Sequence, residues 1–301
     1  MKKENDILEE TLSIAEKDYS AAYRFLLKEY EAEPDSYGPQ TLYFLACLAG
    51  GADLPADALG WLKTAVIDNG WWYRPEVLVD DDLAAIENDP EFVRLKSVSD
   101  SRYFDAVSKS KPVFSLERKS ADNLFLAVHG NTQNGQTARE DWSRALGESS
   151  RWQLETIQSA EPDGYGTYRW SYDEISYLPV AEAIEKAKNE GYEKIVCGGF
   201  SAGCDMLLRA VLFTQVSCDS LILQSPWIPI FESREKELTA ALARKKIGLR
   251  IFCGECDGDC LIPAKRLYEA MKAGGVDAKL VIQKGSRHQF SDEPLDLKAL
   301  L

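Results

Sequence analysis

The segment KIVCGGFSAGCDMLLRAVL, residues 194–212, decides the fold of this chain. Its first residues, 194–198, form an apolar run typical of a buried strand, and a helical pattern begins at Cys204. Between them lies Gly199-Phe200-Ser201-Ala202-Gly203. A serine at such a sharp strand-to-helix turn takes a strained backbone conformation, and glycine two residues before and after it removes steric collisions. The segment therefore predicts that Ser201 is a nucleophile at the start of a helix, whose free N–H groups face developing negative charge.

A serine nucleophile needs a base, and the chain has only two histidines. His288 follows the apolar run 278–282 close to the C-terminal end, in a loop after a predicted last strand. The acid of a Ser–acid–His triad is expected between the other two in the sequence. It would hold the imidazole tautomer and stabilise the imidazolium.

Three carboxylates follow the predicted strand 249–253, namely Glu255, Asp257 and Asp259. We select Asp257, because it lies on a loop past Gly254 that can reach across to His288. Asp259 remains the alternative acid. Glu255 is too close to the strand for this role.

The second histidine, His129, ends another predicted strand, residues 124–128. A His-Gly pair at this place favours an oxyanion hole built from backbone N–H groups. We expect one N–H from Gly130 or Asn131 and the other from Ala202. His129 itself is predicted to be a buried, hydrogen-bonded histidine rather than the base.

These motifs together resemble the phospholipase/carboxylesterase and dienelactone hydrolase-like branch of the α/β-hydrolases. The resemblance covers about residues 112–301 and extends to Gln158-Ser159 and Trp170, which resemble a Pro-Gln-Ser turn followed by a tryptophan near the acyl site. Two positions depart from the pattern: Ile157 replaces the usual proline, and Ala202 stands where carboxylesterase relatives often carry glutamine. The candidate substrate-binding residues are Gln158, Trp170 and Trp227.

The resemblance implies an α/β fold with a doubly wound, mostly parallel sheet. It also implies a serine esterase or thioesterase that acts on a small-molecule acyl substrate through an acyl-enzyme on Ser201. A serine peptidase of the same fold is one alternative. Another is an interaction protein in which the hydrolase domain serves only as a scaffold.

The first part of the chain, residues 1–105, is rich in helix formers and nearly free of strand patterns. Its apolar spacing resembles a tetratricopeptide-type helix pair, so we expect an all-α, helical-repeat-like domain before a catalytic domain at 112–301. One or two repeats fit, which is fewer than a self-sufficient array needs. The module is therefore expected to pack on the hydrolase domain or to bind a protein partner. The serine-rich stretch from Ser97 to Pro112 is interpreted as the linker.

Composition narrows the classes of ligand and cofactor that the chain is expected to bind. The net charge of −14 argues against binding to nucleic acid or to an anionic membrane. With no apolar N-terminal stretch, we expect a cytoplasmic protein with seven reduced cysteines. Cys253, Cys256 and Cys260 are closely spaced, but they lack a second Cys/His cluster at zinc-site spacing. We therefore expect no metal and no other cofactor.

Overall fold

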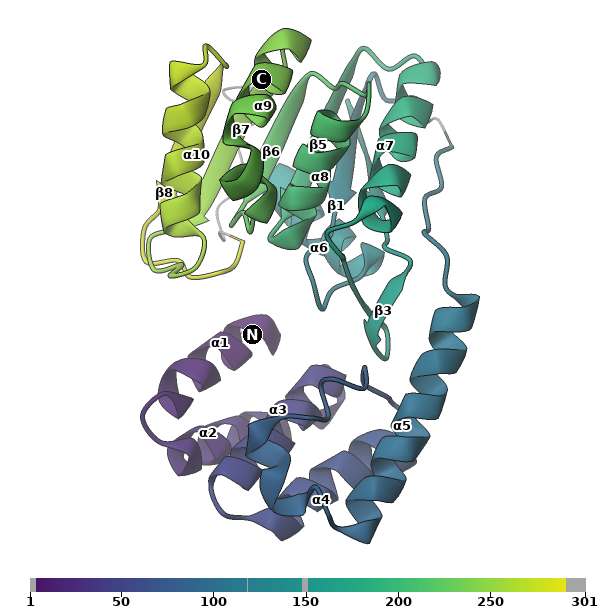
Figure 1. Cartoon of the computed structure of the whole chain (residues 1–301), viewed down its shortest axis with the longest axis vertical. Helices are drawn as coiled ribbons and strands as arrows, with labels where there is room; N and C mark the ends of the chain where they lie inside the picture. The colour runs from purple at the N-terminus through teal and green to yellow at the C-terminus, as the bar shows by residue number, and fades with distance from the viewer. Residues whose placement is uncertain (1–3, 118, 148–150, 291–301) are drawn as a thin grey trace. The chain divides into compact units, whose positions relative to one another are not determined.

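The computed structural model describes residues 4–117, 119–147 and 151–290 (Figure 1). The chain divides into two compact units. The helical unit consists of Met1–Ser110 together with Pro162–Gly166. The sheet unit consists of Lys111–Glu161 and Thr167–Leu301. Each unit has its own apolar core.

The helical unit is built from helices alone over its N-terminal stretch, as the sequence predicts. Its α-helices are α1 (Glu4–Ala15), α2 (Tyr19–Ala32), α3 (Pro39–Gly51), α4 (Pro55–Lys63) and α5 (Pro90–Lys109). Three shorter helical turns join them: η1 (Pro34–Ser36), η2 (Thr64–Asp68) and η3 (Asp81–Ile86). The resemblance to tetratricopeptide repeats stays a prediction.

The linker prediction is wrong over Ser97–Ser108, because α5 runs unbroken to Lys109. This helix buries Phe92, Leu95 and Ser99, which lie on one face at helical spacing. The Ser99 hydroxyl accepts a hydrogen bond from the Tyr73 N–H at 2.9 Å. The serines from Ser97 to Ser108 therefore belong to a helix.

The helical unit also includes a segment far away in the sequence, Pro162–Gly166. Tyr73 forms an antiparallel bridge with Gly164, and Arg74 pairs with Asp163 at 3.0 Å. The Tyr165 ring lies against Trp71 and Trp72, with centroids 6.4 Å away in both pairs. These aromatic residues therefore pack within the helical unit.

The sheet unit contains a six-stranded sheet in the order β2-β1-β5-β6-β7-β8, and every neighbouring pair is parallel. The strands are β1 (Asn123–Val128), β2 (Trp152–Ile157), β5 (Lys194–Phe200), β6 (Ser220–Gln224), β7 (Gly248–Gly254) and β8 (Ala278–Gln283). A separate two-stranded sheet pairs β3 (Glu161–Gly164) with β4 (Thr167–Arg169).

Helices cover both faces of the large sheet. They are α6 (Gly135–Leu146), α7 (Glu174–Asn189), α8 (Ala202–Phe213), α9 (Pro229–Lys245) and α10 (Leu261–Ala273). Leu124, Leu126 and Val128 share one core with α7 to α10, whereas Phe125 and Ala127 share the other with α6. The alternation follows from the period of two in a strand, and Figure 1 shows α7 to α10 on one side. The predicted doubly wound, mostly parallel α/β sheet is confirmed.

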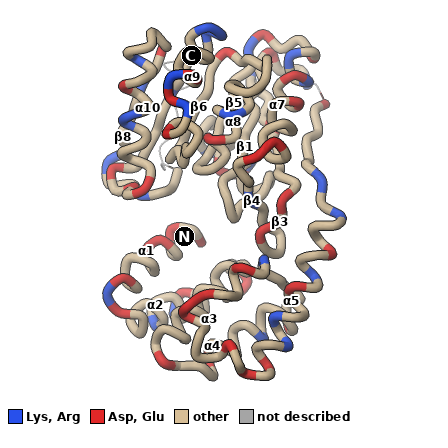
Figure 2. The backbone as a smooth tube through the Cα atoms, viewed as in Figure 1, with Lys and Arg blue, Asp and Glu red and all other residues tan. Residues whose placement is uncertain are grey.

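Charge is distributed over both units. The chain has 49 acidic and 35 basic residues, and Figure 2 shows Asp and Glu along helices of both units rather than in one tail. In the part of the chain that the structure describes, no helix combines the length and apolarity that membrane crossing needs.

A close approach between α8 and the end of β1 gives a test of the fold. A methyl group on Gly203 would lie 2.4 Å from the His129 carbonyl oxygen and 2.6 Å from that of Val128. We expect Gly203→Ala to lower the free energy of unfolding by about 3 kcal/mol, because backbone atoms would have to move. Urea denaturation of the full chain measures this.

The matched control is Gly258→Ala in the same unit, where an added Cβ meets nothing within 4 Å. It should change the free energy of unfolding by less than about 0.5 kcal/mol. Equal stability of both variants would contradict the close packing of Gly203.

Candidate active site

The predicted catalytic residues all lie past the carboxyl ends of strands. Ser201 follows β5, Asp257 lies past β7 and His288 lies past β8. His129 and Gly130 follow β1, which pairs with β5. In a parallel sheet these ends share one edge, which is where α/β proteins bind ligands.

Ser201 sits at a strained turn between β5 and α8. Its backbone has φ 50° and ψ −122°, a left-handed conformation that is costly for a residue with a side chain. The Ser201 N–H is anchored by the Gln224 carbonyl at 3.0 Å, at the end of β6. A Cβ on Gly199 would lie 2.7 Å from the Cys204 nitrogen, so glycine is required before the turn. The geometry is that predicted from the Gly-x-Ser-x-Gly motif.

Asp257 and His288 are brought together by their loops. Asp257 Oδ2 lies 3.0 Å from His288 Nδ1, and the side chains are 2% and 29% exposed. The other Asp257 oxygen accepts the Cys260 N–H at 3.1 Å. Asp259 is exposed and makes no hydrogen bond to His288 among the described residues. Glu255 instead accepts the Gly285 N–H at 3.0 Å.

The Asp257 carboxyl is held in its charged form. Burial alone would raise its pKa, but the hydrogen bond and charge of His288 oppose this. Further hydrogen bonds come from the Cys260 N–H and from Ser225. Together they hold the pKa of Asp257 below its usual value, so the group is a carboxylate at neutral pH.

The two loops are joined by backbone contacts. The Cys256 N–H donates to the Ser286 carbonyl at 2.9 Å. A Cβ on Gly254 would lie 2.3 Å from the Arg287 carbonyl, so only glycine permits this approach. The buried Gln224 side chain donates to the Gln289 carbonyl at 2.8 Å.

These contacts fix the position of the His288 ring. Its centroid lies 5.2 Å from that of Phe200, the residue before Ser201. The His288 ring is thereby held beside the turn that carries Ser201.

Two backbone N–H groups lie where an oxyanion hole is expected. Among the described residues, neither Asn131 nor Ala202 donates its N–H to a protein acceptor. The Gly130 N–H, by contrast, donates to the Gln133 side chain at 2.8 Å. Of the two alternatives for the first donor, this geometry favours Asn131 over Gly130. The Asn131 side chain is itself fixed, because it accepts the Trp170 N–H at 2.9 Å.

His129 is buried beneath the site. Its Nδ1 lies 2.6 Å from the Gly130 carbonyl, and its Nε2 accepts the Ser159 N–H at 3.1 Å. These partners require a neutral ring with the proton on Nδ1. Burial lowers the pKa of His129 to about 4, although the hydrogen bond to Gly130 opposes this. With both nitrogens in use, this ring is a structural element.

The predicted substrate-binding residues occupy different surroundings. Trp170 is buried against the His129 ring, and its indole N–H donates to the His129 carbonyl at 2.8 Å. Gln158 accepts the Gly135 N–H at 3.3 Å at the start of α6. Trp227, in contrast, is 42% exposed. A role in substrate binding stays a prediction for all three.

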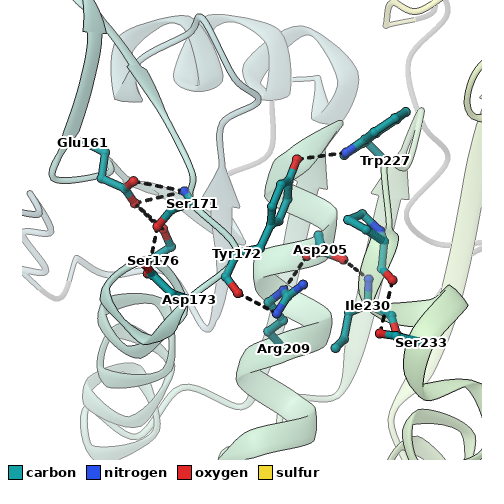
Figure 3. A network of polar contacts seen from close by, with 11 residues as sticks. Glu161, Ser171, Tyr172, Asp173, Ser176, Asp205, Arg209, Trp227, Ile230 and Ser233 are labelled. Atoms are coloured by element: carbon teal, nitrogen blue, oxygen red, sulfur yellow. Dashed lines mark hydrogen bonds and ion pairs between the residues drawn. The ribbon is translucent and has the colours of Figure 1, made fainter.

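A polar network links Trp227 to α8 (Figure 3). The Trp227 indole N–H donates to the Tyr172 hydroxyl at 2.9 Å. The Tyr172 carbonyl in turn accepts a hydrogen bond from Arg209 at 2.8 Å. Arg209 pairs at 2.5 Å with the buried carboxylate of Asp205, which also accepts the Ile230 N–H at 2.8 Å. The network therefore ties two loops to α8.

Two buried thiols lie beside the acid. Cys253 Sγ is 3.8 Å from Asp257 Oδ2, and Cys260 Sγ is 3.6 Å from His288 Nδ1. Burial raises the pKa of Cys253 to about 12, and burial together with the charge of Asp257 also raises the pKa of Cys260. Both are protonated thiols at neutral pH.

Sequence reasoning missed several of these residues. Gln224, Ser225, Tyr172 and the pair Asp205–Arg209 belong to no motif that we recognised. The spacing of Asp205 and Arg209, four residues apart on a predicted helix, was the one local signal, because such pairs form ion pairs.

Comparisons with known proteins agree with this fold. Residues 3–107 match a family described as A/B hydrolase-like, N-terminal domain. A crystal structure of an uncharacterized protein from Bacillus cereus is similar over 96% of this chain and 94% of its own, at 25% identity and a TM-score of 0.52. Esterase PE8 is similar over 64% of this chain and 98% of its own, at 19% identity and a TM-score of 0.51.

Acyl-protein thioesterase 2 of Zea mays is similar over 60% of this chain and 93% of its own, at 15% identity and a TM-score of 0.43. The search of curated proteins gave no match. The likenesses to the Bacillus cereus protein and to esterase PE8 show the fold.

The neutral His129 predicts a pH effect on stability. Its pKa is about 4 when folded and near 6.5 when unfolded, so the unfolded chain binds the extra proton between these values. The contribution of the neutral His129 to the free energy of unfolding is fully present above about pH 6.5 and is lost as the pH falls toward 4. Between pH 7 and pH 5 we expect it to account for a loss of about 2 kcal/mol.

The measurement is urea denaturation of the wild type and of His129→Gln at both pH values. The variant should lose about 2 kcal/mol less than the wild type over this interval. The two proteins share every other titratable group, so the difference between their pH slopes comes from residue 129. Identical pH slopes would contradict a buried neutral His129.

Proposed function

We propose that the chain is a serine hydrolase of the α/β-hydrolase superfamily that cleaves a carboxylic ester or thioester; the family match of its N-terminal part and its sheet fold support this. The observation that supports this most is the Asp257–His288 contact of 3.0 Å, which lies on the same sheet edge as the strained Ser201. Catalysis of this kind needs a nucleophile, a base and an oriented acid. The chain supplies all three at strand ends.

In the proposed reaction, His288 Nδ1–H donates to Asp257, which leaves Nε2 free to accept the Ser201 proton. Ser201 Oγ attacks the carbonyl carbon, and the oxyanion is stabilised by the N–H groups of Asn131 and Ala202. The protonated His288 then gives its proton to the departing alcohol or thiol. Water activated by His288 hydrolyses the acyl-enzyme and restores Ser201.

The surroundings of Trp227 favour an apolar group on the substrate. Trp227 lies three residues past Gln224, whose carbonyl holds the Ser201 N–H. Its hydrogen-bonded partner Tyr172 is 45% exposed, so the two rings offer aromatic surface to a ligand. We therefore assign these rings to the binding of an apolar acyl or leaving group.

Two alternatives use other features. A serine peptidase would use the same nucleophile, base and acid on an amide. An interaction protein would instead use the helical unit to bind a protein partner. The following experiment separates a serine hydrolase, whether esterase or peptidase, from the interaction protein.

The first test is labelling by a fluorophosphonate, which reacts with activated serines. We expect the wild type to be labelled on Ser201 and Ser201→Ala to be unlabelled, because no other serine would have the His288 base. Peptide mapping by mass spectrometry identifies the labelled residue. An unlabelled wild type would favour the interaction protein.

Asp257→Asn and Asp259→Asn form the matched pair for the acid. Asp257→Asn should lower kcat for ester hydrolysis about a thousand-fold or more, because the imidazole loses its orienting carboxylate. Asp259→Asn, on an exposed side chain, should leave kcat within about two-fold. The opposite ranking would move the role to Asp259.

The second test concerns Trp227. Trp227→Ala should lower kcat/KM for esters of long or aromatic acids about ten-fold, and should affect acetate esters less. Phe213→Ala is the control, since Phe213 is 46% exposed but lies at the opposite end of α8 from Ser201. An equal loss for acetate and long-chain esters would contradict the assignment.

A further inference from the structure

Cys260 places a thiol in contact with the acid–base pair. Its Sγ lies 3.6 Å from His288 Nδ1, and the same nitrogen lies 3.0 Å from Asp257 Oδ2. The three ligand atoms lie within 4.8 Å of one another. Neither the proposed hydrolysis nor the positioning of Asp257 uses this thiol, because the Cys260 contact to Asp257 Oδ1 comes from its backbone N–H.

The donor set and its spacing suit a thiophilic divalent cation. Zn²⁺ binds sulfur at about 2.3 Å and nitrogen or oxygen at about 2.0–2.2 Å in tetrahedral sites. Neighbouring ligand atoms in such a site are then roughly 3.3–3.6 Å apart. The separations of 3.0 and 3.6 Å at Cys260, His288 and Asp257 therefore need only a small adjustment of side chains.

We propose that Asp257, Cys260 and His288 form an inhibitory site for a thiophilic divalent cation of the Zn²⁺ class. The site differs from a cofactor site, because the ion would bind in place of the proton that His288 shares with Asp257. Binding of the cation is inferred from the distances among these three side chains. The inhibition rests on the proposed serine hydrolase function.

The chemistry of binding is balanced by one proton. Cys260 releases its thiol proton to solvent and binds as thiolate, which a coordinated cation strongly favours. The imidazole stays neutral, and its proton moves through solvent exchange from Nδ1 to Nε2. The carboxylate and the thiolate together neutralise the 2+ charge, as a buried site requires.

Inhibition follows from the tautomer. With the ion on Nδ1, His288 Nε2 carries the proton and cannot accept one from Ser201. The carboxylate of Asp257 is at the same time occupied by the ion. The partly exposed His288 ring, 29% of which is accessible, provides the solvent-facing side of the site.

Cd²⁺ is the probe of choice, because its bond to a thiolate absorbs in the ultraviolet and can be followed without turnover. The full chain is titrated with Cd²⁺ alone as wild type, Cys260→Ala and Cys256→Ala. Cys256 is exposed and lies four residues before Cys260, so it reports adventitious binding to a nearby thiol. Cys47→Ala is a second control, since Cys47, Asp80 and Asp82 form another close group of such side chains.

We expect a thiolate absorption in the wild type and in both controls, and its loss in Cys260→Ala. Loss of a residue that only hydrogen-bonds to a metal ligand lowers metal affinity by up to about 100-fold. Because Cys260 would bind the ion directly, its loss should raise the Cd²⁺ concentration for half-inhibition by at least about 100-fold. Each variant is compared with its own metal-free rate of ester hydrolysis, so a change in basal activity does not enter.

The outcomes separate the two proposals. Absorption that disappears in Cys256→Ala or Cys47→Ala but persists in Cys260→Ala overturns the site, and so does the absence of any absorption. Absorption at Cys260 in a protein without esterase activity supports the site and contradicts the proposed function. Absorption at Cys260 with unchanged ester hydrolysis overturns the inhibition.

Discussion

The close approach of α8 to the end of β1 is the constraint on which the rest of the site depends. Gly203 lies against the carbonyls of Val128 and His129, where no larger residue fits. This contact brings the start of α8 beside the loop after β1. Ala202, the first residue of α8, and Asn131, two residues past His129, therefore lie on the two segments that this contact joins. The strain at Ser201, whose φ is 50°, is the local cost of that geometry, and the buried strands on both sides maintain it.

A second constraint operates at the loops that follow β7 and β8, the last two strands in the order of the sheet. The loops after β7 and β8 are joined through Gly254, which the His288 loop approaches closely, and through the Cys256 N–H. Gln224 connects Ser201 to these two loops, since its carbonyl accepts the Ser201 N–H and its side chain donates to the Gln289 carbonyl. Ser201, Asp257 and His288 are therefore positioned largely by contacts to backbone atoms. A substitution that shifts one of these loops will consequently change the relative positions of all three side chains.

The sequence allowed the sheet to be predicted, and with it the places of the candidate catalytic residues at strand ends, because both depend on local pattern. Ser201, Asp257 and His288 follow apolar runs, and strand ends in a parallel sheet lie together whatever the loops do. Features that depend on long-range packing could not be predicted in this way. The pairing of Pro162–Gly166 with Trp71 to Arg74 joins segments far apart in the chain. The contact of Tyr172 with Trp227 depends on two irregular loops. The stretch from Ser97 to Pro112 was interpreted as a linker, but α5 continues to Lys109 and the buried Ser99 hydroxyl accepts the Tyr73 N–H.

The backbone hydrogen bond that Asp257 accepts from residue 260 also determines which side chain lies beside His288. The carboxylate must be buried to orient His288, and burial must be compensated by hydrogen bonds. The start of α10 provides one of them, the Cys260 N–H, and any residue except proline at position 260 would provide it. The backbone geometry that delivers this N–H also directs the side chain of residue 260 toward His288. With alanine there, the pair would have only an inert methyl group beside it. With cysteine, the pair gains a third ligand atom, so the residue at this position decides whether the acid–base pair can also hold a metal ion.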